Sequence, residues 1–268
     1  IYIDDATVAP KPTVVKGNVD MKVGTDSVGY LITASNTKTD IKTKASNDVH
    51  IGENSVYIYS KAPQSLGGKI ETESKIVTDG SNSYGIYSSQ DFVNRGDINL
   101  KSGTGNIGIY SSQGIGQNYG TIEVGPSNVA TGKYGVGMAT GNGTIENHGN
   151  INVTENNSVG MYASGSSAKA INRGTINLKG NDTVGMYIDN HATGENYGTI
   201  QTTPTASGTG IKGVVVKNGG IIKNYGTINI VGSGNTGVYT DVASAYQIQG
   251  GSSNTSTNAS SLGTAVSM

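Results

Sequence analysis

The sequence of 268 residues contains no cysteine and no tryptophan, and it has a single phenylalanine. The lack of cysteine excludes a disulfide scaffold and any thiolate-ligated metal site. Only 34% of the residues are hydrophobic, which is too few to fill one thick globular core. Because these residues follow a strict pattern, the composition favours a thin core shared between many short elements rather than disorder.

An excess of charge of one sign is also missing, since 18 basic residues balance 19 acidic ones. This balance excludes the basic footprint expected for a nucleic-acid partner or for an anionic membrane surface. No hydrophobic run reaches the roughly 18 residues of a membrane span, and the start at Ile1 lacks the features of a signal peptide. We therefore predict no nucleic acid and no direct membrane insertion, and we expect a mature or excerpted sequence.

What the sequence has instead is a repeat in which two short motifs alternate. The first motif, Asn-x-Gly-x-Ile, has a worn copy at residues 16–19 and clear copies beginning at Asn94, Asn118, Asn147, Asn172, Asn196 and Asn224. The second motif, Gly-(Ile/Met/Val)-Tyr, begins at Gly85, Gly108, Gly160, Gly185 and Gly237, with variants at Gly29, Tyr57, Gly135 and Gly213. Successive second motifs lie 23 to 28 residues apart, and this spacing predicts about nine turns of a stacked architecture.

Both motifs predict β-strands, because apolar residues recur at every second position. Val159, Met161 and Ala163 alternate with Gly160 and Tyr162, and no segment between the motifs has a helical period. A third, weaker strand precedes each asparagine of the first motif. The sequence therefore predicts an all-β parallel solenoid in which a single chain supplies three strands per coil and the rod is about 43 Å long at about 4.8 Å per coil.

The motifs also divide the chain. We expect residues 1–16 to form a preceding partial coil or loop, residues 17–241 to form the repeats, and residues 242–268, rich in Ser, Thr, Asn and Gly, to form an irregular coil or linker. Two coils are longer, and their insertions at 125–128 and 203–206 should form loops on one side of the stack. No motif predicts a cap at either end, so we expect the chain to be part of a longer stack.

The segments "NYGTI" and "NRGTIN", alternating with "VGMY" and "GIYSS", resemble the passenger repeats of the large monomeric type V autotransporter adhesins of fusobacteria. The resemblance covers residues 17–241. It implies a right-handed parallel β-helix displayed on the outer membrane, attached to a C-terminal membrane barrel, and used for adhesion to other bacteria or host cells through a surface protein or glycan. The absence of cysteine is compatible with the implied secretion route, in which the passenger crosses the outer membrane unfolded.

Two columns of equivalent residues follow from the first motif. Its asparagines should stack from coil to coil and form a structural ladder of amide hydrogen bonds at Asn94, Asn118, Asn147, Asn172, Asn196 and Asn224. The residue after each asparagine should face solvent and carries a flat side chain, at Arg95, Tyr119, His148, Arg173, Tyr197 and Tyr225. This planar column is a candidate ligand-binding surface for sugars or an extended partner, but the alternative is that its members only stack on each other and stiffen the rod.

A third column comes from the tyrosines of the second motif, which should point outward at Tyr59, Tyr87, Tyr110, Tyr162, Tyr187 and Tyr239. The frame of the motif places Gly137 and Val215 in this column as interruptions. Both interruptions fall in the coils that carry insertions, so we expect the inserted loops to fold over the tyrosine face. This is the one place where the sequence predicts a shaped pocket.

Catalytic and metal motifs are weak. Arg95-Gly96-Asp97 spells an integrin-recognition tripeptide, but the repeat itself already explains Arg-Gly. Glu146 and Glu195 share one position two coils apart, a separation of roughly 9.6 Å that approaches the upper limit for an inverting glycosidase pair, but exposed carboxylates there are expected to be solvated. The three histidines occupy unrelated positions. We predict no enzyme activity, no catalytic residue, no metal and no cofactor.

Three functions remain open from the sequence. The first is a segment of a surface-exposed adhesin passenger that mediates or displays adhesion between cells or to a host. The second is a purely structural stalk, and the third is a polysaccharide-degrading β-helix enzyme. The sequence does not name the ligand or the flanking domains.

Overall fold

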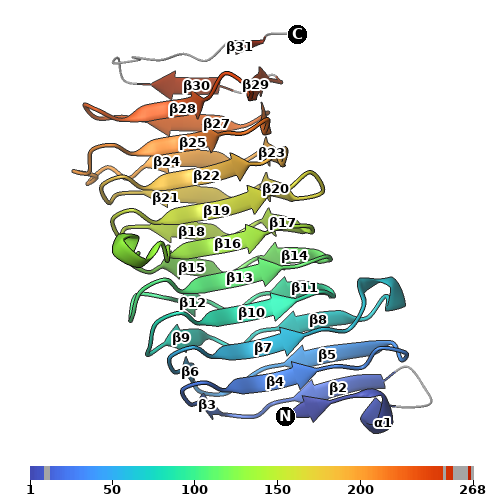
Figure 1. The fold of residues 1–268 in the computed structure, drawn as a ribbon. Helices are drawn as coiled ribbons and strands as arrows, with labels where there is room; N and C mark the ends of the chain where they lie inside the picture. Colours follow the sequence, from blue (N-terminus) through green and yellow to red (C-terminus); the bar gives the residue numbers. More distant parts are fainter. Residues whose placement is uncertain (9–12, 250–251, 256–264, 267–268) are drawn as a thin grey trace.

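The computed structural model describes residues 1–8, 13–249, 252–255 and 265–266. The chain winds as a right-handed parallel β-helix, and each turn adds one strand to each of three sheets (Figure 1). Every pairing between named strands in the described residues is parallel and joins neighbouring turns, as in β10 with β7 and β13. The predicted all-β parallel solenoid with three strands per coil is confirmed.

Sheet A contains ten strands in the described part of the chain. They are β1 (Tyr2–Ile3), β4 (Val28–Ile32), β7 (Val56–Ser60), β10 (Tyr84–Ser88), β13 (Ile107–Ser111), β16 (Val136–Thr140), β19 (Val159–Ser164), β22 (Val184–Asp189), β25 (Lys212–Val216) and β28 (Thr236–Thr240). These strands carry the second motif.

Sheet B contains eleven strands within the described residues, and most of them end on the asparagine of the first motif. They are β2 (Thr13–Gly17), β5 (Thr39–Thr43), β8 (Lys69–Thr72), β11 (Asp91–Asn94), β14 (Ile115–Asn118), β17 (Thr144–Asn147), β20 (Lys169–Asn172), β23 (Thr193–Asn196), β26 (Ile221–Asn224), β29 (Ala245–Ile248) and β31 (Ala265–Val266).

Sheet C, with ten strands in the described ranges, carries the isoleucine that closes the first motif. Its strands are β3 (Lys22–Val23), β6 (Val49–Ile51), β9 (Ile76–Thr78), β12 (Ile98–Asn99), β15 (Thr121–Val124), β18 (Asn150–Val153), β21 (Thr175–Leu178), β24 (Thr199–Thr202), β27 (Thr227–Ile230) and β30 (Ser252–Thr255). Three short helical segments interrupt the coils: α1 (Asp5–Val8), η1 (Gln64–Leu66) and η2 (Val129–Thr131). None of the helices found in the described residues has the length and hydropathy to cross a membrane.

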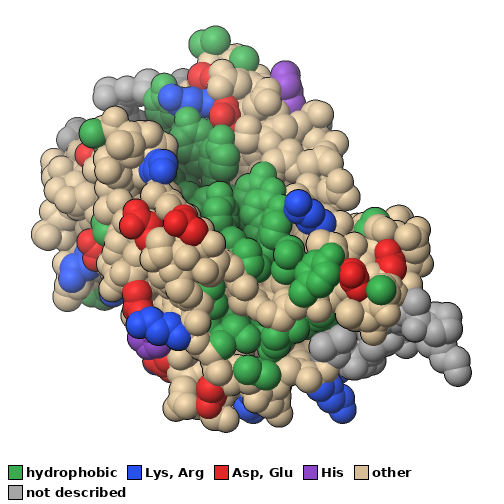
Figure 2. All heavy atoms as spheres, turned by 60° about the horizontal axis from the view of Figure 1, so that its bottom comes forward, with side chains coloured by type: hydrophobic (Ala, Val, Ile, Leu, Met, Phe, Trp, Pro, Cys, Tyr) green, Lys and Arg blue, Asp and Glu red, His purple; other side chains and the backbone are tan. Residues whose placement is uncertain are grey.

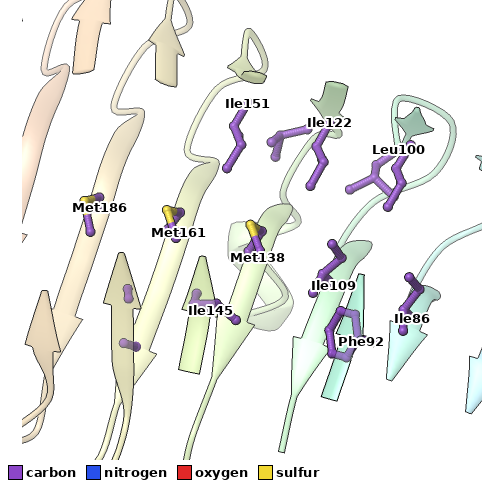
Figure 3. Close-up of a cluster of buried hydrophobic side chains, with 14 of the residues drawn as sticks. Ile86, Phe92, Leu100, Ile109, Ile122, Met138, Ile145, Ile151, Met161 and Met186 are labelled. Carbon is purple, nitrogen blue, oxygen red and sulfur yellow. The ribbon is translucent and has the colours of Figure 1, made fainter. Parts of the chain in front are cut away.

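The core is a set of columns of identical or similar side chains inside the coils. Met138, Met161 and Met186 are register partners in consecutive coils, and all three are fully buried (Figure 3). The isoleucines of sheet C, such as Ile122 and Ile151, form a facing column. Each residue therefore buries its apolar surface against the equivalent residue above and below, so a chain with few hydrophobic residues can still close a core.

The predicted alternation of inward and outward side chains in the second motif is wrong at its glycine. Gly160 and Met161 are both buried within the coil, and Val159 lies on the outer face, where it packs with the tyrosine column. A Cβ atom on Gly160 would lie 2.6 Å from the carbonyl oxygen of Gly185 and 3.0 Å from a methyl group of Ile176. Because backbone and core approach so closely, only glycine fits, and the period of two breaks there.

The turn count differs from the predicted nine, since sheets A and C each hold ten strands in the described residues. The additional strands lie toward the two ends: β1 and β2 in residues 1–17, where a partial coil or loop is predicted up to residue 16, and β29 to β31 within residues 242–268, predicted to be an irregular coil or linker. β29 pairs with β26 and continues sheet B. The rest of the predicted linker, at 250–251, 256–264 and 267–268, lies outside the described residues.

Candidate functional site

The asparagines of the first motif form a buried ladder at the end of the sheet B strands. Each amide donates to the next one: Asn94 to Asn118 (2.9 Å), Asn118 to Asn147 (3.0 Å), Asn147 to Asn172 (3.0 Å), Asn172 to Asn196 (2.9 Å) and Asn196 to Asn224 (2.8 Å). Four of these five Nδ2 atoms, all except that of Asn196, also donate to the carbonyl oxygen of the residue two positions later, as Asn147 does to Gly149. All six side chains are fully buried, so the ladder is an internal feature of the turn.

The ladder fixes the position of the residue that follows it. The main-chain N–H of His148 donates to the carbonyl of Asn118, and the N–H of Gly149 donates to the same oxygen. A Cβ atom on Gly149 would collide with the carbonyl oxygen of Gly120 in the neighbouring coil. The turn is therefore held in one register from coil to coil, and the planar side chains project from it at a constant spacing.

The side chains of the planar column stack on each other along the column. Arg95 lies over the ring of Tyr119, which stacks on His148 with ring centroids 4.5 Å apart and planes 8° apart. Arg173 lies over Tyr197, which stacks on Tyr225 at 4.4 Å and 3°. The three tyrosines remain exposed at their edges, with 43%, 40% and 36% of their surface accessible for Tyr119, Tyr197 and Tyr225 respectively. Within each run of three, the inner faces contact each other, so the edges remain for contact with a ligand.

Two carboxylates flank this column, and both are engaged rather than solvated. Glu146 accepts a hydrogen bond from Gln117 and lies 3.2 Å from Nε2 of His148, and Glu195 is 2.8 Å from Nζ of Lys169. Burial alone would raise the pKa of Glu146, but its hydrogen bonds and the nearby His148 and Arg173 charges lower it below the ordinary value.

The expectation of solvated carboxylates is therefore wrong, because both side chains are largely buried between neighbouring coils. Ile171 lies between Glu146 and Glu195 in the strand register. Each carboxylate has its own local partners and does not face the other across an open cleft.

The Arg95-Gly96-Asp97 tripeptide is part of the repeat turn. The Arg95 guanidinium lies over Tyr119, and Asp97 accepts a 2.8 Å hydrogen bond from the main-chain N–H of Thr121. A Cβ atom on Gly96 would collide with the carbonyl of Ser74. Both charged side chains therefore make contacts within the coil stack, and the segment is not a projecting loop.

The outer face of sheet A carries a second hydrophobic cluster, separate from the core. Its members are Ile107, Tyr110, Val136, Ala139, Val159, Tyr162, Val184, Tyr187, Val215 and Tyr239. Figure 2 shows hydrophobic side chains gathered along a hollowed stripe between raised, more polar borders. We call the sheet A hollow lined by Tyr84, Tyr110, Tyr134, Tyr162 and Tyr187 the tyrosine trough; its volume is about 690 Å³.

One residue interrupts the tyrosine column in the middle of the trough. The register pairs Tyr110 with Ala139 and Ala139 with Tyr162, so Ala139 and not Gly137 interrupts the tyrosine column. The predicted frame of this coil is therefore wrong by two residues, because the segment Gly135-Val136-Gly137-Met138 offers two glycines and the second one occupies the buried position. The second interruption, Val215, lies between Tyr187 and Tyr239 as predicted.

The first insertion forms one wall of the trough. Residues 126–135 loop outward around η2, and Gly132, Lys133 and Tyr134 line the hollow, whereas residues 203–206 of the second insertion are absent from its lining in the described structure. Further polar groups of its lining come from Asn157, Asp182 and Asp189. The sequence predicts a pocket in this coil, but it does not predict Lys133, Tyr134, Ala139 or Asp182 as its residues; the coincidence of an insertion with a missing tyrosine is the signal that points there.

The next feature is the set of histidines and acidic residues. Across the ranges that the structure describes, no three His, Asp or Glu side chains are close enough together to hold an ion. His50 and Asp79 make a pair at 2.8 Å on the outside of sheet C, with Lys22 at 4.0 Å from the same carboxylate. This cluster is exposed and has the composition of a surface ion pair.

A β-helix with an aromatic trough and a planar column on its outside belongs to the class of parallel β-solenoids. The comparison with protein families agrees with this class: the model of the BigA third pectate lyase-like domain matches residues 11–197, well over half of the chain, and the chain belongs to this family. This match supports an autotransporter family of β-helix domains. No curated protein and no solved structure gives a significant match.

Proposed function

We propose that this chain is a non-catalytic contact segment of a surface-exposed autotransporter adhesin, and that the tyrosine trough touches a surface protein or glycan of another bacterium or a host cell. The observation that carries the proposal is the trough itself: ten hydrophobic residues gather on the outside of sheet A instead of inside the coil. Five of them are buried and five, including the tyrosines, are only partly buried, so the tyrosine rings present apolar surface to the outside of the fold, and contiguous apolar surface of this kind marks interaction sites. The repeat motifs support a fusobacterial origin within the broader family, and the family supports a cell-surface location.

The planar column supports a different role. Its flat groups already stack on each other, so a sugar ring cannot lie on their inner faces. We propose that Arg95, Tyr119, His148, Arg173, Tyr197 and Tyr225 mainly stiffen the rod and contact a partner only through their edges. The planar column therefore fits the stalk hypothesis, and the tyrosine trough fits the adhesin hypothesis.

Adhesion of displayed protein tests the proposal. The chain is displayed on a non-adherent bacterium, and binding to epithelial cells and to partner bacteria is counted for the wild type, for Tyr110→Ser/Tyr162→Ser in the trough, and for Tyr119→Ser/Tyr197→Ser/Tyr225→Ser in the planar column. Thermal unfolding of each purified chain verifies the fold. We expect adhesion by the wild type and the column variant and loss by the trough variant; a folded wild type that does not adhere would leave only the stalk.

The enzyme hypothesis has a separate test. Incubation with polysaccharides should release no reducing ends and no unsaturated products, since Glu146 and Glu195 are engaged with neighbouring side chains. Product formation that disappears in Glu146→Gln or Glu195→Gln would contradict the non-catalytic assignment.

A further inference from the structure

Some tyrosine rings on the outside of the coil stack lie under cationic side chains of the same chain. The described residues contain four such pairs: Lys61 over Tyr59, Lys217 over Tyr239, Arg95 over Tyr119 and Arg173 over Tyr197. The two ammonium groups lie 5.4 and 5.7 Å from the ring centres, and the two guanidinium carbons lie closer, at 4.9 and 4.5 Å. Each pair is attractive because the face of an aromatic ring is negative.

One of these pairs also includes a carboxylate. Lys217 lies over Tyr239, which belongs to the next coil, and Asp241 follows that tyrosine by two residues. The hydrogen bond from the hydroxyl of Ser244 lowers the pKa of Asp241, and the charge of Lys217 lowers it further. The outer face of sheet A therefore holds one set of tyrosine ring, carboxylate and ammonium that the chain supplies by itself.

At Tyr187, which lines the trough, the chain supplies only the ring and the carboxylate. Asp189 follows Tyr187 at the same spacing of two residues, and both side chains line the trough. In the preceding coil the register partner of Asp189 is Ser164, so no lysine stands where Lys217 stands in the complete set. Among the described residues, no Lys or Arg side chain lies over the ring of Tyr187 or over those of Tyr134 and Tyr162.

The Asp189 carboxylate has one oxygen that is fixed and one that is available. Its Oδ1 accepts hydrogen bonds from Nδ2 of Asn218 at 2.7 Å and from the main-chain N–H of Asn190 at 2.9 Å. Its Oδ2 accepts none from the described residues, and no ion pair involves it there. Lys217, the neighbour of Asp189 in the next coil, lies over Tyr239 instead. The carboxylate is thus held in place and can accept from a partner.

The tyrosines near Asp189 belong to the same site. The ring centres of Tyr162 and Tyr187 are 5.6 Å apart and their planes are inclined by 59°, so these rings do not close each other's faces as the parallel rings of the planar column do. Burial raises the pKa of Tyr187, and Asp189, Tyr162 and Tyr134 raise it further, because they lie near its hydroxyl. We call this group, Tyr134, Tyr162, Tyr187 and Asp189, the β22 site.

The charges along the trough are negative at this end. Asp182, which is exposed, lines the other border of the trough in the same coil. Lys133 also lines the trough, but its Cβ is 2.9 Å from the position of a Cβ on Gly105, in the coil of β13, three coils or roughly 14.4 Å from that of β22. Lys212 is outside the lining, and its ammonium donates to the carbonyl of Gly210 at 3.0 Å.

A cation that carries N–H donors fits the β22 site. Its charge is attracted by the ring faces, and its N–H groups can donate to Oδ2 of Asp189. A guanidinium is flat, so it can lie on a ring and donate in its own plane at the same time. A quaternary ammonium would contact the rings but leave Asp189 without a donor, and a neutral sugar or aromatic ring would leave its charge unpaired.

The rest of the trough indicates what surrounds this cation. Ile107, Val136, Val159 and Val184 are register partners in four consecutive coils, and all of them line the trough. The strip beside the β22 site is therefore apolar, and it runs along the stack. Side chains next to the cation in a bound partner should accordingly be apolar.

We propose that the β22 site binds an arginine side chain of a partner surface protein. The guanidinium lies against the tyrosine rings and donates to Oδ2 of Asp189, and the apolar neighbours of the arginine contact the strip from Ile107 to Val184. This inference rests on the proposed adhesive function and names the chemical group that the trough recognises.

Short peptides test the site in solution. The probe has five residues, with a central arginine between two valines and a serine at each blocked end. The control peptides carry citrulline, which has the shape of arginine without its charge, or trimethyllysine at the centre. Binding to the purified chain is followed by NMR of isotope-labelled tyrosines, and Tyr→Phe variants assign the signals.

The variants remove one group at a time. Asp189→Asn keeps an oxygen that can accept from Asn218 and Asn190, and Tyr134→Ser changes an exposed ring of the inserted loop. Glu53→Gln is the matched control, because it removes the same charge from an exposed turn that does not line the trough. Thermal unfolding verifies that each chain is folded.

We expect the wild type and Glu53→Gln to bind the arginine peptide with shifts of the Tyr134, Tyr162 and Tyr187 signals. The citrulline peptide and the Asp189→Asn chain should each bind about tenfold more weakly, and Tyr134→Ser about threefold more weakly. Equal binding of arginine and citrulline peptides, tighter binding of trimethyllysine, unchanged binding by folded Asp189→Asn, or no binding by the wild type would each overturn the inference.

The adhesion assay separates this inference from the proposed function. If the displayed wild type adheres but the purified chain does not bind the arginine peptide, the arginine site is wrong and the adhesive function stands with another ligand. If the peptide binds and Asp189→Asn weakens that binding, but the displayed wild type adheres to no cell, the arginine site stands and the adhesive function is wrong.

Discussion

The planar column and the tyrosine trough are both stacks of flat side chains, but only the trough has an opening. The planar column repeats a flat group in six consecutive coils, and its ring contacts at 4.4 and 4.5 Å close its inner faces. The tyrosine column has an alanine in the same kind of series, and the same coil carries an inserted loop. The uniform stack closes the faces of its own rings, whereas the tyrosines and the inserted loop together line a hollow of about 690 Å³.

The comparison also shows where the stability of the rod resides. The turn under the planar column is built from a buried amide ladder and from glycines in contact with the neighbouring backbone. The trough lies on the opposite, partly exposed side of a sheet whose core is formed by other residues. We therefore expect substitutions beneath the planar column to affect folding and substitutions in the trough to affect contacts with partners.

The largest effect is expected at the turn glycine. Gly149→Ala places a methyl group against the carbonyl of Gly120, which is rigid backbone, and should destabilise the chain by about 3 kcal/mol or more in urea unfolding. Gly132→Ala is the control, because its Cβ would have open space and meets only the cost of a positive φ, about 1 kcal/mol. Equal losses in the two variants would contradict close coil contact at the turn.

The second-largest loss of stability is expected on removing one member of the buried asparagine ladder. Asn147→Ala leaves Asn172 without its donor and should reduce the free energy of unfolding by about 2 kcal/mol. Asn152, whose amide donates to Glu123 on the outer face of sheet C, provides the comparison. Asn152→Ala should reduce the free energy of unfolding by less than about 1 kcal/mol because water replaces its partners. A larger loss for Asn152→Ala than for Asn147→Ala would contradict a ladder buried in the core.

High pH should reduce the stability of the fold through the buried Tyr30. Burial, with a smaller contribution from Tyr57, raises the pKa of Tyr30 from 10.0 to about 12. The folded state then holds the proton more tightly than the unfolded state, so this stabilisation is complete below pH 10 and is lost as the pH rises toward 12. We expect urea unfolding to show an added loss of about 2 kcal/mol over this range in the wild type relative to Tyr30→Phe. Parallel pH profiles of the two chains would contradict it.

The sequence predicts the fold well because the period of the two motifs directly encodes the coil. Equal spacing places Asn118 over Asn94 and Met186 over Met161 without any knowledge of distances, and the structure has both alignments. The prediction of which residues of the second motif point inward is wrong at Gly160. Two successive residues point inward there because the backbone of the next coil lies against Gly160, and this contact between coils cannot be predicted from the motif alone.

The candidate site is less predictable for a similar reason. In the coil with the first insertion, the two glycines Gly135 and Gly137 fit the motif equally well, and only pairing with β13 and β19 decides that Ala139 occupies the tyrosine position. The partners of Glu146 come from Gln117 in another coil and from His148 across the turn, so local sequence cannot show that this carboxylate is engaged.

Cysteine pairs test the coil-on-coil register most directly, because the chain has no cysteine of its own. Asn152 and Asn177 are register partners on the outer face of sheet C, and Gln201 lies one coil further. Asn152→Cys/Asn177→Cys should form an intramolecular disulfide under mild oxidation, whereas Asn152→Cys/Gln201→Cys, at roughly 9.6 Å, should not. A disulfide in the second chain but not in the first would contradict the stack from which both columns follow.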